Sequence, residues 1–193
     1  MRLSPPITIL AIVVAAMGWL IIDRAWTEHN NLEACSVAEA FADFTQVEAD
    51  VFGGPPLTMP LTATAVDQLQ QRLPDTPEYR IASELLSRSV MEKPIDPLAA
   101  CPNLATRLDK FGIAHGQAAV DSALSYKAAK AKSPNRPIYV LAMRLPLVSA
   151  NGKFAIVEMT YSSAVYKSGD ILLVRKGING HWAEVTKLRM WVS

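Results

Sequence analysis

Residues 149–161 read SANGKFAIVEMTY, and this stretch decides the class of the fold. Asn151-Gly152 is the dipeptide most typical of a tight turn between two antiparallel strands, because both residues tolerate the left-handed backbone of such turns. Successive side chains of a strand point to opposite faces, so Val157 and Met159 are expected on the core side. The stretch therefore predicts a β-hairpin whose second strand packs on a hydrophobic core.

Further strands extend this hairpin in both directions. Residues 138–148 form an apolar run in which Pro146 marks an edge or a strand end, and strands are also expected over 170–176 and 181–192. In the last strand the apolar positions change parity, so a β-bulge is expected near Thr186-Lys187 to keep them on one face. The C-terminal part therefore predicts a four-stranded antiparallel meander.

A histidine, a tryptophan and a glutamate at 181–184 follow the turn Gly177-Ile178-Asn179-Gly180. We interpret His181 as a residue of the hairpin tip, Trp182 as a side chain that packs across the strand pair and Glu184 as solvent-exposed. These residues are not expected to form a catalytic site.

The part before the strands carries helical signals. Ser36 and Glu39 have capping-box spacing ahead of a helix that is expected to end near Asp50, and a loop follows over 53–60. Proline and capping signals then predict helices over 64–73 and 77–92 and one interrupted helical stretch over 97–111. An alanine-rich helix is expected over 117–131. In the helix at 77–92, the residues expected to face inward are Ile81, Leu85 and Val90.

The order of elements predicts an α+β fold in which a helical layer covers one face of the meander. The expected parts are residues 1–26, a membrane anchor or signal segment; 27–136, the helical part; and 137–193, the sheet part of the same domain. This order is similar to that of NTF2-like and related cone-shaped folds. The similarity rests on element order over about the latter two-thirds of the chain, so no functional residue is transferred from it.

The N-terminal segment sets the expected compartment. Residues 7–22 read ITILAIVVAAMGWLII, a run without charge that is slightly short of the roughly 20 residues that span a bilayer. We favour an uncleaved anchor over a cleaved signal peptide, because the run continues past the weak cleavage site at 14–16. A buried core helix is the third alternative. Arg2 favours a cytoplasmic N-terminus, which puts the domain on the extracytoplasmic side, the periplasm in a bacterial cell.

The two cysteines of the chain lie beyond this segment. Cys35 precedes the first long helix and Cys101 lies at the break before Pro102. An oxidising compartment favours their pairing, so we predict a Cys35–Cys101 disulfide, with two separately buried thiols as the alternative.

Composition and motifs exclude several functions. The net charge of +1 lacks the basic excess that nucleic-acid binding uses. The sequence contains no HExxH, CxxC, Gly-x-Ser-x-Gly or glycine-rich phosphate motif, so we expect no catalytic residue, no metal site and no cofactor.

Two functions of different classes remain for the exported domain. The first is protein interaction or assembly in the cell envelope without enzymatic activity, for which the loop with Tyr161, Tyr166 and Lys167 offers a contact surface. The second is binding of a small ligand in a pocket between sheet and helices. The residues expected to line that pocket are Met143, Val157, Met159 and Trp191. An enzymatic role ranks below both.

Overall fold

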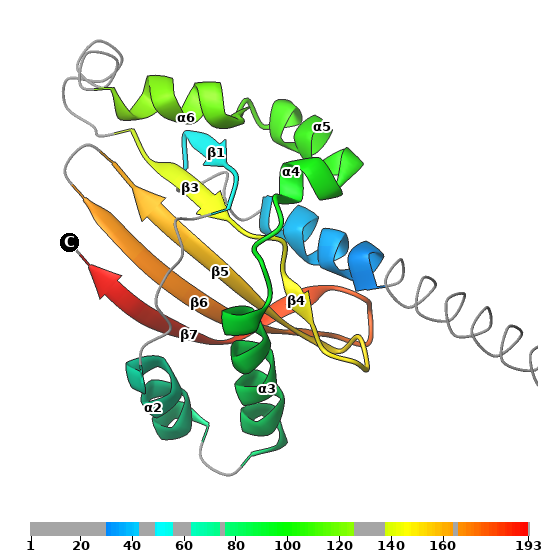
Figure 1. Ribbon diagram of the computed structural model, residues 1–193. Coiled ribbons are helices and arrows are strands. Elements are labelled where there is room, and N and C mark those ends of the chain that lie inside the picture. Colours follow the sequence, from blue (N-terminus) through cyan, green and yellow to red (C-terminus); the bar gives the residue numbers. More distant parts are fainter. Residues whose placement is uncertain are drawn as a thin grey trace, which may run out of the picture.

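The computed structural model describes residues 30–42, 49–55, 63–73, 76–125, 138–163 and 166–192. Seven strands form one sheet at its centre (Figure 1). The strands are β1 (Val51–Gly53), β2 (Ala114–His115), β3 (Val140–Met143), β4 (Leu147–Val148), β5 (Phe154–Ser162), β6 (Lys167–Lys176) and β7 (Trp182–Val192).

Helices pack around this sheet. Residues 30–42 are helical and are called the first helix below. The labelled helices are α2 (Ala63–Arg72), α3 (Pro77–Met91), α4 (Pro97–Ala100), α5 (Pro102–Lys110) and α6 (Gln117–Leu124). Thr76 and Asp96 cap α3 and α4 by accepting hydrogen bonds from backbone N–H groups, as is typical of such residues at helix N-termini. Among these described helices, none is long and apolar enough to cross a bilayer; residues 1–29, with the expected anchor, lie outside the described residues.

The four-stranded meander is confirmed as one part of the sheet, but the prediction of a purely antiparallel four-stranded sheet was wrong. The strand order is β2-β1-β3-β5-β6-β7, and β4 also pairs with β5. β1 runs parallel to both β2 and β3, which makes the sheet mixed. The sequence interpretation placed Gly53 in a loop, because a three-residue strand is too short to show a period.

Helices cover both faces of the sheet, not one face as expected. On one face, Val157 and Met159 share a core cluster with residues of the first helix and of α5. On the other face, Phe154 and Ile156 pack with residues of α2 and α3. The residues of β5 from 154 to 160 are therefore all buried.

Both predicted turn features of the meander are present. Gly152 adopts a left-handed backbone with φ of 66°, and Ser149 N–H donates to the Phe154 carbonyl across the turn at 2.8 Å. In the β6–β7 ladder, Leu173 pairs with Thr186 whereas Val174 pairs with Glu184. The intervening Val185 is thus the extra residue of a β-bulge, beside the predicted position.

Two helix predictions need correction. The first helix is already formed at residue 30, so Ser36 does not cap it; instead Ser36 Oγ accepts a hydrogen bond from Trp182 Nε1 at 3.0 Å. Val90 of α3 is 66% exposed. The buried side of that helix carries Ala82, Leu85, Leu86 and Ser89, whose spacing of three or four residues turns Val90 towards solvent.

Candidate functional site

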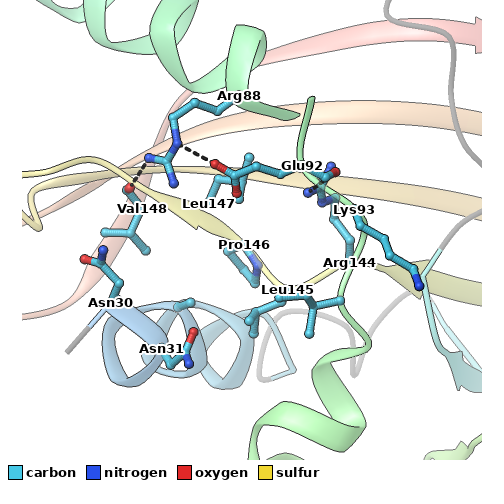
Figure 2. Close-up of a pocket in the computed structure, with 12 residues that line it drawn as sticks. Asn30, Asn31, Arg88, Glu92, Lys93, Arg144, Leu145, Pro146, Leu147 and Val148 are labelled. Atoms are coloured by element: carbon cyan, nitrogen blue, oxygen red, sulfur yellow. Dashed lines mark hydrogen bonds and ion pairs between the residues drawn. The ribbon is translucent and has the colours of Figure 1, made fainter. Parts of the chain in front are cut away.

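A small cleft lies between the first helix, α3 and β4. Its volume is about 90 Å³. Figure 2 shows Asn30 and Asn31 on the side of the first helix and Arg88 and Glu92 across the cleft. The other lining residues are Ala34, Lys93, Ile95, Arg144, Leu145, Pro146, Leu147 and Val148.

An interruption of the strand next to β5 forms the floor of this cleft. β3 and β4 both pair with β5, and residues 144–146 leave the ladder between them. Pro146 has no N–H group to donate to a neighbouring strand, so a break here is expected. Leu145 N–H instead donates to the Ile95 carbonyl at 2.8 Å, which holds the segment before α4 against the cleft.

Arg144 lies buried beneath the C-terminal end of α3. Its Nη1 donates to the Ser89 carbonyl at 2.9 Å and its Nη2 to the Glu92 carbonyl at 3.3 Å. Carbonyls at a helix C-terminus lack partners within the helix and carry partial negative charge, so a guanidinium stabilises them. Arg144 therefore fixes the end of α3 that borders the cleft.

Glu158 of β5 is the charge partner of Arg144. Glu158 Oε1 lies 3.5 Å from Arg144 Nη1, and the two side chains are only 9% and 5% exposed. Three buried atoms around this pair lack a hydrogen-bond partner among the described residues: Ser89 Oγ, Arg144 Nε and Glu158 Oε1. Unpaired buried polar atoms are costly, so this ion pair stabilises the fold less than a fully hydrogen-bonded pair would.

The remaining charges of the cleft lie nearer to solvent. Arg88 Nε donates to Glu92 Oε1 at 2.8 Å and Arg88 Nη1 to the Val148 carbonyl at 3.0 Å (Figure 2). Lys93 and Ile95 are exposed at the mouth, Ile95 to 51%. Arg88 and Arg144 are paired with Glu92 and Glu158, so Lys93 supplies the excess positive charge of the cleft. A positive charge beside an apolar strand edge suits an apolar group that carries negative charge.

A second, more open cleft also borders the first helix, and Asn31 lines both clefts. Its volume is about 520 Å³. Its lining residues come from the first helix and from the junction of α4 and α5: Asn31, Leu32, Cys35, Ser36, Glu39, Ala100, Pro102 and Asn103. Leu32 is 71% exposed at its side, which leaves an apolar contact point beside the polar groups.

The predicted disulfide is confirmed at the edge of this second cleft. Cys35 and Cys101 are bonded, and their Cα atoms lie 5.3 Å apart, within the usual range for such a bond. The bond ties the first helix to the N-terminus of α5. A disulfide indicates an oxidising environment, in agreement with an extracytoplasmic location.

The expected contact loop is short and largely folded back on itself. Ser163 N–H donates to the Tyr166 carbonyl at 2.7 Å, and Tyr166 N–H donates to Ser163 Oγ at 3.1 Å. Tyr161 lies in β5 and Lys167 begins β6, so both belong to strands. Residues 164–165 lie outside the described residues.

Beside Tyr161 lies a charge cluster that the sequence interpretation missed. Asp170 is fully buried; Lys187 Nζ lies 3.1 Å from its Oδ2, and Arg189 Nε donates to its Oδ1 at 3.1 Å. Lys187 also lies 5.9 Å from the centre of the Tyr161 ring. The hydrogen bond to Asp170 and the charge of Asp170 raise the pKa of Arg189 above its ordinary value. The sequence signal for this cluster was the pair of cations at 187 and 189 in one strand and an aspartate within the apolar strand before it.

Three of the four residues expected to line a ligand pocket are buried in the core. Met143, Val157 and Met159 are at most 2% exposed and belong to one core cluster. Neither cleft described above includes them. The side chain of Trp191 lies outside the described residues.

The histidines and comparisons add no enzymatic assignment. His181 is exposed at the β6–β7 turn, and His115 Nε2 lies 3.1 Å from Asp109 Oδ1 at the surface. Within the described part of the chain, no three histidine, cysteine, aspartate or glutamate residues lie together as a metal site would need.

No family model, curated protein or solved structure matches this chain. A function must therefore be argued from the two clefts and the disulfide.

Proposed function

We propose that this chain is a membrane-anchored extracytoplasmic domain without enzymatic activity that binds another envelope protein through the cleft between the first helix, α3 and β4. The anchor is the apolar run at residues 7–22, and the disulfide supports an oxidising location for the domain. A tether raises the local concentration of the domain at the membrane surface, which favours assembly with neighbouring membrane proteins.

The main support for the proposal is the position of the cleft between the first helix, α3 and β4, close in sequence to the apolar run. Asn30 and Asn31 line it, and they begin the described chain eight and nine residues after Ile22, where the apolar run ends. At no more than about 3.6 Å per residue, Asn30 lies within roughly 29 Å of that end of the run. The cleft therefore belongs to the part of the domain that an anchor would hold nearest to the membrane.

The size of the cleft favours a protein segment over a free metabolite. A volume of 90 Å³ holds about three water molecules at roughly 30 Å³ each, whereas ligand pockets usually measure about 300–1,000 Å³. One side chain fits such a space. The exposed Lys93 and Ile95 suit a partner segment in which an apolar residue neighbours a carboxylate.

One observation supports the alternative function, binding of a small ligand. The open cleft beside the disulfide measures about 520 Å³, and the polar groups of Asn31, Ser36 and Asn103 line it together with Leu32. The sequence predicted a ligand site in the interior, whereas this alternative places the ligand at the surface.

Photocrosslinking in native membranes tests the proposal. A photoreactive residue at Ile95 is expected to form an adduct with one protein, whereas the same residue at Leu124, an exposed position on α6, is not. The substitution Lys93→Glu should reduce the Ile95 adduct, because it places a negative charge at the mouth of the cleft; Lys110→Glu on α5 is the matched control. Equal adducts at Ile95 and Leu124, or no effect of Lys93→Glu on the Ile95 adduct, would contradict the proposal. A third photoreactive residue at Asn103 tests the second cleft, and capture of a metabolite there, with no protein captured at Ile95, would also contradict the proposal.

A further inference from the structure

The two cysteines of the disulfide differ in exposure. Cys101 is 0% exposed and belongs to the main core cluster, whereas Cys35 is partly exposed and packs at the margin of that cluster. Cys35 lines the open cleft of about 520 Å³, and Cys101 does not. A thiolate that enters this cleft therefore meets Cys35 and not Cys101.

The position of Cys101 favours it as the leaving group when a thiolate attacks Cys35. Cys101 is the N-cap residue of α5, a helix of nine residues, and makes no capping hydrogen bond through its side chain. The N-terminus of a helix stabilises negative charge, so it favours release of Cys101 as a thiolate.

We infer that Cys35 is the exchange site of this disulfide and that a thiol–disulfide oxidoreductase forms its mixed disulfide there. In the reducing direction, a partner thiolate attacks Cys35 Sγ; a bond forms between the two sulfurs, the Cys35–Cys101 bond breaks, and Cys101 leaves as a thiolate. The second thiol of the partner then attacks the mixed disulfide as a thiolate and releases Cys35 as a thiol. In the oxidising direction, Cys35 attacks the disulfide of the partner and Cys101 resolves the product. The inference stands independently of the proposed envelope partner.

Trapping on the unmodified chain tests this inference. The folded full chain in detergent is incubated with reduced glutathione, quenched with iodoacetamide and digested for mass spectrometry. Glutathione is expected on Cys35 and carbamidomethyl on Cys101 in nearly all trapped molecules. Glutathione on Cys101, or equal amounts on both residues, would overturn the inference, as would failure to react below the denaturant concentration that unfolds the chain.

Two helix positions give a matched control for the route. Asn103→Trp places an indole at the open cleft and should slow exchange at Cys35 about tenfold or more, because a reagent must enter there. Lys110→Trp, at the other end of α5, should leave the rate unchanged. Equal rates in the two variants would show that the cleft is not the route. Single-thiol variants add a second measurement: Cys35 in Cys101→Ser should react with an aromatic disulfide reagent about 100-fold faster than Cys101 in Cys35→Ser, which reacts only after local opening.

Discussion

Removal of the disulfide should cost the domain a large part of its stability. The perturbation is the pair of substitutions Cys35→Ala and Cys101→Ala. The bond joins residues 66 positions apart, and it fastens the first helix to α5 on one face of the sheet. Without it, the unfolded chain regains the conformational freedom that the cross-link removes.

The expected loss follows from the length of the closed loop. Loop-closure entropy for 66 residues amounts to about 15 cal/mol/K, or about 4 kcal/mol at 25 °C. The space left by two missing sulfurs adds to this loss, because Cys101 is fully buried. Domains of this kind have free energies of unfolding of about 5–15 kcal/mol, so the variant should be marginally stable.

Urea unfolding of the full chain in mild detergent measures this loss. Trp182 is a suitable fluorescent reporter, since it is 6% exposed and hydrogen-bonded to Ser36, next to Cys35. With a slope of about 2 kcal/mol per molar urea, the midpoint should fall by roughly 2 M. The unsubstituted chain after reduction is the control, because it keeps both sulfurs and loses only the bond. A loss under about 1 kcal/mol in both samples would refute the assignment of the stabilisation to this cross-link.

Three further substitutions test other parts of the structure. Arg144→Met should destabilise the fold by about 3–5 kcal/mol in the same assay because it leaves Glu158 buried without a partner, and Glu158→Leu in addition should recover most of that loss; no recovery would contradict the ion pair. Asp170→Asn should cost about 1–3 kcal/mol, since Lys187 and Arg189 lose their counter-charge; unchanged stability would argue against the cluster. Val157→Asp should yield little soluble folded protein, as it buries an unpaired charge, whereas Val192→Asp at a 55% exposed position should be tolerated; a stable Val157→Asp protein would contradict the sheet assignment.

Local signals explain what the sequence could predict. The Asn151-Gly152 turn depends on the conformations that those two residues allow, and the bulge beside Thr186 follows from the parity of nearby apolar residues. The disulfide followed from having two cysteines beyond an export signal. None of these predictions required knowledge of distant contacts.

The missed features depend on pairings between distant segments. β1 has three residues and pairs with β3 almost 90 positions later, so no local period reveals it. The first four residues of β5, Phe154 to Val157, are all apolar, so both alternating sets begin with apolar side chains, yet the pattern was interpreted as one-sided. The later Glu158 and Thr160 gave the second set a polar character that hid its burial. Arg144 contacts carbonyls more than 50 positions earlier, and the cleft that it borders could not be foreseen.

The measurement that tests the account most directly is mass spectrometry of the chain isolated from carbonate-washed native membranes after thiol labelling without reduction. The account predicts that residues 7–22 are still attached to the domain and that Cys35 and Cys101 are both unlabelled and joined to each other. A chain found in the soluble fraction without residues 7–22, or one with two labelled thiols, would contradict a disulfide-bonded domain held at the outer face of the membrane by its own anchor.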